Sequence, residues 1–247
     1  MSRRGGSCHS GAIWKVAASR RRSVVAAVCL ALQKEYGLPR HGNPNRPLDD
    51  LIFIVLTNRS SPVAAARVYR GLRREFPKWD DLLSAPAARL RELLRPLGLH
   101  VIRTRYLRSL LLQLQRDFGR CTLTPIRHWS STDQAAYLQA LSGVSEKVAK
   151  CVMMYTLEAK VLPVDTHVHR VARRLGWVNR RRADQCHGEL EALVPAVKRY
   201  AFHVDCIAHG RAICRSQQPR CLSCVLRRWC DYGQERSQQT SIATRSR

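Results

Sequence analysis

The chain has 247 residues, enough for one large hydrophobic core or two smaller ones, and hydrophobic residues make up 45% of it. Its 43 Lys and Arg residues against 18 Asp and Glu residues give a net charge of +25 and an isoelectric point near 10.8. This balance indicates a globular protein that binds a polyanion, most simply nucleic acid, although a generally basic composition without such a partner is an alternative. An anionic membrane surface is disfavoured, because no segment combines one basic face with one broad apolar face.

The N-terminal segment is strongly basic. Residues 1–22 contain no acidic residue and are rich in Arg, Ser and Gly, and Glu35 is the first acidic residue of the chain. We expect residues 1–19 to form a flexible basic tail that contacts nucleic acid, although a mitochondrial transit peptide has the same composition. A secretory signal is excluded, because the apolar run at 24–32 has no small-residue cleavage site after it and continues as one amphipathic helix.

The rest of the chain consists of apolar periodic segments separated by short polar breaks. Residues 39–47 form a loop rich in Pro, Gly and Asn, and Ser61-Pro62 has the residue types of a helix N-cap and first helical position. Apolar residues recur at three- and four-residue spacing without the alternation of strands, which predicts an all-α protein. Helices are expected at about 20–36, 48–56, 62–75, 79–96, 100–117, 131–141, 147–158, 166–175, 182–199 and 202–209.

The stretch that begins at Leu141 has the pattern of a helical hairpin. Leu141-Ser142-Gly143-Val144 can form a tight turn in which Gly143 tolerates a left-handed backbone, and Ser145 can cap the helix that follows. The free N–H groups at such a helix start suit a phosphate, although an ordinary hairpin without a ligand has the same pattern.

Two charged residues near this hairpin can perform chemistry. Lys147 lies in the first turn of the second helix, where the helix dipole and partial burial disfavour a charged ammonium, and a neutral amine is a nucleophile. Asp165 lies just before Thr166, which we expect to cap the next helix. The 18 residues that separate Lys147 from Asp165 allow a helix, a reversal and a return to the same end. The two residues therefore predict a site for chemistry on nucleic acid.

The cysteines form a second pattern. Four of the ten lie within a 17-residue segment with the spacing Cys-x6-Cys-x2-Cys-x5-Cys: Cys214, Cys221, Cys224 and Cys230. Such crowding does not fit a disulfide scaffold in a helical chain of this size, and soft thiolates bind either zinc or an iron–sulfur cluster. The other six cysteines show no pairing pattern and are expected to be buried thiols, which together with thiolate ligands indicates a reducing compartment.

These motifs resemble those of the helix-hairpin-helix (HhH-GPD) DNA glycosylases, most closely the endonuclease III branch. The resemblance covers about residues 20–231 and rests on the hairpin, on Lys147, on the Val-Asp-Thr-His run at 164–167 and on the cysteine spacing. It implies a two-lobed fold with an iron–sulfur cluster loop. The implied parts are a lobe at 48–165 with its hairpin at 141–152, a lobe at 166–231 that packs with the helix of 20–38, and a flexible tail at 232–247.

The resemblance also implies roles for individual residues. Lys147 would attack the deoxyribose C1′ of a flipped nucleotide, and Asp165 would stabilise the cationic sugar. The four clustered cysteines would hold a [4Fe–4S] cluster rather than zinc. DNA contacts are implied for the hairpin and for the cysteine loop: Gly143, Val144, Ser145, Arg215 and Arg220.

Two further residues are implied to act on the base stack. Leu99, in the loop Gly98-Leu99-His100, matches the wedge loop of the family, although core packing is the alternative for a lone leucine. Arg59 falls where endonuclease III carries a Gln that fills the gap left by the flipped base, and a plain solvent-facing arginine is the alternative.

The chain departs from the family at Ser142 and Ser145, where Pro and Gly are usual. Relatives that remove mismatched thymine or adenine usually have Tyr or Ser in place of Lys147, so this lysine favours a bifunctional glycosylase and AP lyase that acts on damaged, oxidised pyrimidines in double-stranded DNA. The alternatives are a mismatch or modified-base glycosylase and a non-catalytic DNA-binding relative. We expect an intracellular monomer without membrane contact, in the cytoplasm or nucleoid, or in the mitochondrion or nucleus of a eukaryote.

Overall fold

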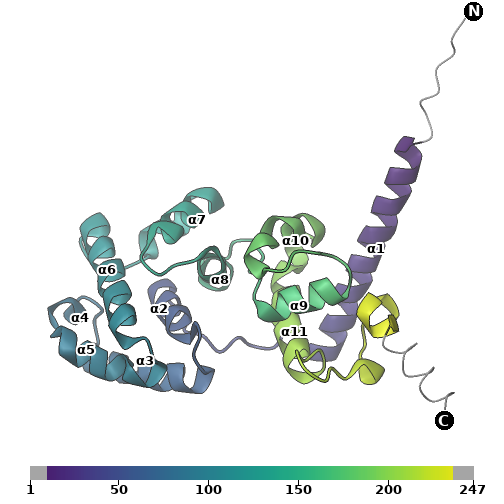
Figure 1. The fold of residues 1–247 in the computed structure, drawn as a ribbon. Helices are drawn as coiled ribbons and strands as arrows, with labels where there is room; N and C mark the ends of the chain where they lie inside the picture. The colour runs from purple at the N-terminus through teal and green to yellow at the C-terminus, as the bar shows by residue number, and fades with distance from the viewer. Residues whose placement is uncertain (1–9, 236–247) are drawn as a thin grey trace, which may run out of the picture. The chain divides into compact units, whose positions relative to one another are not determined.

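The structure, a computed structural model, describes the backbone of residues 10–235 and the side chains from residue 23 onwards. Within this range every regular element is a helix (Figure 1), which confirms the all-α prediction. The α-helices are α1 (Ser10–Tyr36), α2 (Pro47–Thr57), α3 (Pro62–Glu75), α4 (Asp81–Ser84), α5 (Ala87–Leu94), α6 (His100–Phe118), α7 (Ser131–Ala140), α8 (Glu146–Thr156), α9 (Thr166–Arg174), α10 (His187–Leu193) and α11 (Arg199–Ala212). Short 3₁₀ helices are η1 (Arg95–Leu97), η2 (Thr124–His128), η3 (Ala183–Gln185), η4 (Ala196–Lys198), η5 (Cys221–Ser223) and η6 (Arg227–Trp229). No helix of the described range is long and apolar enough to cross a lipid bilayer.

Two predicted helices are interrupted at prolines. The helix expected at 79–96 breaks before Pro86, where Ala85 is extended with a ψ of 142°, because a residue that precedes proline avoids the helical conformation. The helix expected at 182–199 breaks in the same way before Pro195, where Val194 has a ψ of 120°. In both segments the apolar spacing continues across the break, which is why periodicity alone predicted one helix.

Both predicted tails are shorter than expected. The first helix begins at Ser10, so residues 10–19 are helical rather than part of a flexible tail. At the other end, residues 231–235 form a helical turn that follows the last clustered cysteine. The remaining tail residues, 1–9 and 236–247, lie outside the described part of the chain.

The chain divides into two compact units. Unit 1 combines the N-terminal residues up to Arg40 with the chain from Val164 onwards, and unit 2 comprises His41–Pro163. The N-terminal helix therefore belongs with the C-terminal segment. The division between the units falls two residues earlier than we expected, so that Asp165 belongs to unit 1 and Lys147 to unit 2.

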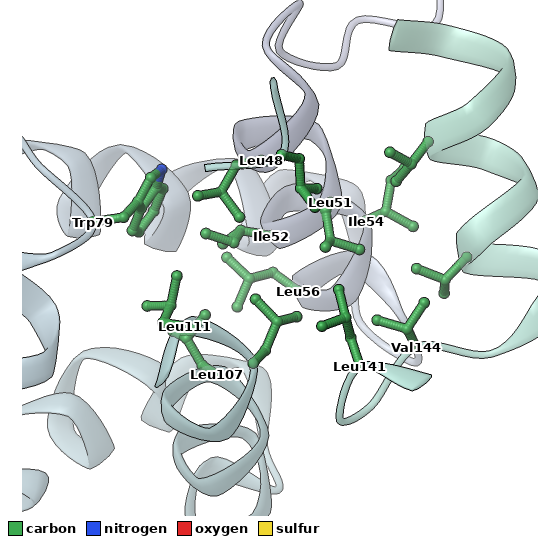
Figure 2. Close-up of a cluster of buried hydrophobic side chains, with 14 of the residues drawn as sticks. Leu48, Leu51, Ile52, Ile54, Leu56, Trp79, Leu107, Leu111, Leu141 and Val144 are labelled. Atoms are coloured by element: carbon green, nitrogen blue, oxygen red, sulfur yellow. The ribbon is translucent and has the colours of Figure 1, made fainter. Parts of the chain in front are cut away.

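Unit 2 is built around α2. Proline begins this helix at a position whose N–H needs no intrahelical partner, and α2 contacts both α3 and α8. Figure 2 shows the apolar residues of α2 in the middle of a buried cluster that also includes Trp79, Leu107 and Leu111. Leu141 and Val144 of the hairpin turn, 2% and 8% exposed, belong to the same cluster, so the turn is anchored to the core by apolar contacts.

Unit 1 is organised by α11, which contacts both α1 and α9. Gly210 permits the contact with α9, because a Cβ at this position would lie 2.5 Å from Nδ1 of His167 and 2.9 Å from Nη2 of Arg170. The stacked rings of Trp177 and Phe202, whose centroids are 5.6 Å apart, extend the packing. The start of α9, which carries Asp165, is therefore held against the helix that leads into the cysteine loop.

Arg103 of α6 joins two loops of unit 2. Its side chain belongs to a residue that is only 7% exposed. The guanidinium donates hydrogen bonds to the carbonyls of Val55 (3.0 Å), Asn58 (2.7 Å) and Gly98 (3.0 Å) and to the hydroxyl of Ser60 (2.9 Å). One side chain therefore holds the loop of Arg59 to the loop of Leu99.

Replacing Arg103 by methionine keeps an apolar stem and removes every donor. We expect Arg103→Met to lower the free energy of unfolding by about 2–4 kcal/mol, because the carbonyls lose charged partners worth about 1.5–3 kcal/mol each and water replaces them only in part. Urea denaturation followed by circular dichroism measures this loss. The control is Arg105→Met, at an exposed neighbour on the same helix, which should change stability by less than about 0.5 kcal/mol. Equal stability of the two variants would contradict the role of Arg103.

Candidate functional site

The helix-hairpin-helix consists of α7, the turn at 141–145 and α8. Gly143 has a φ of 81°, a left-handed conformation that strains residues with a Cβ. A Cβ at this position would also lie 3.0 Å from Cδ2 of Tyr106. Glycine is therefore required both by the backbone and by the space beside it, and the predicted turn is present.

The two serines at which the chain departs from the family both form hydrogen bonds. Ser142 donates to the hydroxyl of Ser109 on α6 at 3.0 Å, which ties the turn to that helix. Ser145 is the N-cap of α8, and its hydroxyl accepts the N–H of Val148 at 3.4 Å. The helix start is thus capped, and the remaining N–H groups of its first turn, which lack intrahelical acceptors, suit an anion.

Lys147 is the second residue of α8, and its side chain is half-buried. Lys150, one turn further along the helix, is only 8% exposed, and its ammonium lies 3.1 Å from the carboxylate of Glu146. Of these two lysines, the more accessible amine is therefore the one next to the hairpin turn.

The charge of Lys147 acts on a buried carboxyl of the same unit. Asp50 of α2 is 0% exposed, and Asn43 donates from Nδ2 to its Oδ1 at 2.7 Å. Burial raises the pKa of Asp50 to about 7, while the Asn43 bond and the positive charge of Lys147 act in the opposite direction. The sequence analysis missed this residue, and the available signal was a second consecutive acid, after Asp49, at the start of an apolar helix.

Asp165 is the N-cap of α9. Its Oδ1 accepts the backbone N–H groups of His167 at 2.9 Å and of Val168 at 2.8 Å. The prediction that Thr166 is the cap is wrong by one residue, because Asp165 has the extended backbone of a cap and Thr166 is already helical. Both bonds use Oδ1, so Oδ2 is not engaged in the cap. Because Asp165 and Lys147 belong to different units, their pairing stays a prediction.

The two residues expected at the base stack are both exposed. Leu99 is 55% exposed, which excludes core packing. Arg59 is exposed as well, and this fits both a residue that fills the gap left by a flipped base and a plain solvent-facing arginine. Both have left-handed backbones, with φ values of 50° and 55°. Such conformations are strained in L residues and persist only where neighbours hold them, as Arg103 does here for both loops.

The four clustered cysteines come together in unit 1. They line one small cavity whose walls also include Arg174 and Tyr232. Within the described range, no three His, Cys, Asp or Glu side chains form a group that could hold a single metal ion. The four thiols therefore surround a shared space rather than converge on one point.

Two arginines of α9 hold the cysteine loop. Arg174 donates to Sγ of Cys214 at 3.2 Å and to the carbonyl of Arg215 at 2.8 Å, and Arg170 donates to the carbonyl of Cys214 at 2.7 Å. Arg215 and Arg220, the predicted DNA contacts, lie on this loop and are exposed. The loop is thus bonded to the helix that Asp165 caps.

The surroundings of the thiols fit a thiolate-bound cluster. The N–H of Gly233 donates to Sγ of Cys230 at 3.4 Å, and Nε2 of His209 lies 3.5 Å from Sγ of Cys224; hydrogen bonds to sulfur are typical of iron–sulfur sites. Burial raises the pKa of Cys230 to about 11 and raises that of Cys224 as well. A cationic centre is what converts such thiols to thiolates, so the donor set suits a metal cluster.

The other described cysteines are thiols without disulfide bonds, as expected. Cys29, Cys151, Cys186 and Cys206 are buried and Cys121 is half-buried, and none of these five forms a disulfide. Cys8 lies outside the described part of the chain.

Comparison with known proteins yields several relatives. Endonuclease III of Escherichia coli is 28% identical over 198 residues, which cover 77% of this chain and 86% of the relative, and endonuclease III of Thermotoga maritima is 26% identical over 198 residues, covering 80% and 89%. A putative DNA glycosylase of Arabidopsis thaliana is 30% identical over 165 residues, which cover 66% of this chain. The match spans only 56% of that plant protein.

Solved structures share the fold. An endonuclease III in a non-covalent complex with DNA matches with a TM-score of 0.77 at 23% identity, covering 88% of this chain and 98% of the other. A thermostable thymine-DNA glycosylase matches with a TM-score of 0.72 at 20% identity, with the same coverage. Residues 52–196, more than half of the chain, match the HhH-GPD superfamily of base excision DNA repair proteins, and this chain belongs to that superfamily.

Proposed function

We propose that this member of the superfamily is a bifunctional DNA N-glycosylase and AP lyase that removes damaged, oxidised pyrimidines from double-stranded DNA. The observation that carries the proposal is the half-buried amine of Lys147 at the second position of α8, directly after the glycine turn. An amine at this position can attack a sugar while the N–H groups of the helix start hold a neighbouring phosphate. The endonuclease III relatives support the same assignment.

DNA binding in this proposal depends on charge first. The net charge of +25 attracts the phosphate backbone without regard to sequence, and Gly143, Val144 and Ser145 contact it at the hairpin. The target nucleotide must leave the stack, because an amine cannot reach C1′ behind a stacked base. Leu99 fills or opens the stack, and Arg59 donates to acceptors on the orphaned partner base, for which guanine is well suited.

The chemistry begins at the amine. The lone pair of Nζ of Lys147 attacks C1′, and the C1′–N bond breaks so that the base departs with the bonding electrons and takes up a proton. Asp165 stabilises the positive charge that develops on the sugar. Opening of the ring at O4′ leaves an iminium between Nζ and C1′. Loss of a C2′ proton then expels the 3′ phosphate, which nicks the strand, and water hydrolyses the iminium to free the enzyme.

The cysteine loop is proposed to hold a [4Fe–4S] cluster through Cys214, Cys221, Cys224 and Cys230. When bound, the cluster supplies a rigid connection between the ends of the loop. The chain itself contributes the Arg170 and Arg174 bonds that fix the loop to α9. Arg215 and Arg220 are thereby presented to phosphates of the DNA.

A mismatch or modified-base glycosylase on the same scaffold is the second candidate, and the fold shared with a thermostable thymine-DNA glycosylase favours it. Such an enzyme would release a base without nicking the strand, whereas a non-catalytic relative would bind DNA only. Lys147 favours the lyase, because an amine that forms an imine is needed for β-elimination. We further propose a monomer, and a reducing intracellular compartment, which the lack of disulfides among the described cysteines supports.

The assignment of the nucleophile predicts a covalent adduct. Borohydride should trap the chain on a duplex with a suitable lesion, and Lys147→Gln should abolish both trapping and nicking, because an amide cannot form an imine. Binding to an abasic-site analogue should persist, since phosphate contacts come from backbone and arginines. Lys150→Gln, on the same helix, is the matched control and should still trap. An adduct that survives in Lys147→Gln would assign the amine to another residue.

The role of Asp165 predicts slower base release without loss of folding. Asp165→Asn should reduce the single-turnover rate of base release by about 10²–10³-fold, the usual effect of losing one electrostatic stabiliser. The cap should survive, because asparagine is as good an N-cap as aspartate. Asp184→Asn, an exposed acid of unit 1 paired with Arg182, is the control for charge. Equal rates for both variants would remove Asp165 from the chemistry.

The cluster assignment predicts iron. Protein purified anaerobically should be brown and contain about four iron atoms per chain with acid-labile sulfide. Cys221→Ser should lose the iron and weaken DNA binding, because the loop of Arg215 and Arg220 loses its connection. Cys121→Ser, at a free thiol of unit 2, should keep the iron. A colourless wild-type protein with stoichiometric zinc would contradict the assignment.

A further inference from the structure

The carboxyl of Asp50 is the buried group of unit 2 that the proposed chemistry leaves without a role. The residue is 0% exposed, although it is charged in its usual state. Its Oδ1 accepts the Asn43 bond at 2.7 Å, but its Oδ2 is buried and has no hydrogen-bond partner within the described residues. A buried polar atom without a partner costs about 1–3 kcal/mol, so its presence calls for an explanation.

The elements around Asp50 show which charge it faces. From α8, which packs on α2, Lys147 acts on the carboxyl, while Glu146 and Lys150 of the same helix pair with each other at 3.1 Å. From the loop before α2, His41 stacks on Tyr155 with ring centroids 4.1 Å apart.

Neither neighbour of Asp50 on the N-terminal side of α2 competes with Lys147 for the carboxyl. Burial lowers the pKa of His41, so its ring is neutral near pH 7. Asp49, the preceding residue, is bonded to other groups: the hydroxyl of Tyr69 at 2.9 Å and Nε1 of Trp79 at 3.0 Å. Among these charged groups, Lys147 is therefore the one whose charge acts on the Asp50 carboxyl.

We propose that Asp50 is a positioning residue for Lys147, and that its unpaired oxygen takes up the ammonium proton so that the amine can attack. The inference rests on the proposed lyase function. In this step the side chain of Lys147 first approaches Oδ2 of Asp50, which has no hydrogen-bond partner in the described structure. One proton then moves from Nζ to Oδ2, the electron pair of the broken N–H bond stays on nitrogen, and the carboxylate becomes a neutral acid. The amine then attacks C1′, and the acid returns its proton to water after turnover.

Burial makes this proton transfer less costly than it would be to an ordinary carboxylate. A carboxylate in an apolar surrounding is disfavoured relative to the neutral acid, which is why the pKa of Asp50 rises to about 7. The protonated Asp50 carboxyl contributes to folding stability below its pKa in the unfolded chain, about 4. This contribution is lost as the pH rises through its pKa in the folded chain. The chain therefore holds, at neutral pH, an acceptor that gains stability when it receives a proton.

The test is the pH dependence of strand nicking at an abasic-site duplex under single-turnover conditions, from about pH 5.5 to about 9.5. The wild-type rate should fall below about pH 7, where Asp50 is already protonated. In Asp50→Asn the amine must lose its proton to solvent. The acidic limb of the pH–rate profile should therefore shift upward by at least about one pH unit, and the rate at pH 7 should be about tenfold lower than that of the wild type. At alkaline pH the rate should recover, and affinity for an abasic-site analogue should be unchanged.

Two further variants separate this role from packing. Asp49→Asn changes the neighbouring buried carboxyl and should lower stability while keeping the wild-type pH profile. Asp50→Leu replaces the buried acid by an apolar side chain, which proteins often accept without loss of stability, and should show the same alkaline shift as Asp50→Asn. It provides the measurement if the asparagine variant does not fold.

The outcomes that overturn the inference are distinct from those that overturn the proposed function. A profile of either Asp50 variant that superimposes on the wild type, or a rate that falls by one factor at every pH, would overturn the role of Asp50 alone. A wild-type chain that nicks no abasic site at any pH would overturn the lyase function and, with it, this inference.

Discussion

The packing of α2 on α8 is the contact on which the candidate site of unit 2 depends. α2 lies in the middle of the buried cluster (Figure 2), and its apolar residues hold it against α8. Near the start of α2, this packing brings the Asp50 carboxyl within electrostatic reach of Lys147. At the end of α2 it places the loop of Arg59, which Arg103 bonds to the loop of Leu99. An apolar contact thus positions the proposed nucleophile, a carboxyl and the two residues proposed to act on the base stack, none of which has to hold the helices together.

The register of α8 is decided by sterics and hydrogen bonding at the hairpin turn. Gly143 permits the left-handed backbone and the close approach of Tyr106, and Ser145 caps the helix. Because successive helical residues are rotated by about 100°, a cap one residue earlier or later would turn Lys147 to another face. Ser145 fixes this register, since its hydroxyl supplies the cap at which the helix begins.

Local patterns predicted those parts of the fold that depend on neighbouring residues. The helices expected at 62–75 and 100–117 are observed at Pro62–Glu75 and His100–Phe118, and four cysteines within a 17-residue segment do line one cavity. Contacts that join distant segments were not predictable. Arg103 bonds to Asn58 across 45 positions, and the effect of the Lys147 charge on Asp50 depends on how α2 packs on α8. A single sequence shows the charged residue but not the partner that the tertiary packing supplies.

Two consecutive acids of α2 show how a structural buried charge differs from one poised for chemistry. Asp49 is bonded to Tyr69 and Trp79 and lies 3.5 Å from Nε of Arg73, so its Oδ1 has three polar neighbours, one of them cationic. Asp50 has one hydrogen bond and one buried oxygen without a partner in the described structure. A carboxyl required for stability alone would be bonded like Asp49 or replaced by an apolar residue, because an uncompensated buried group is destabilising. Unsatisfied groups of this kind collect where a proton or a partner must change during a reaction. The positive charge of Lys147 acts on this carboxyl, and an acceptor needs such an open oxygen before it can take the proton of the amine.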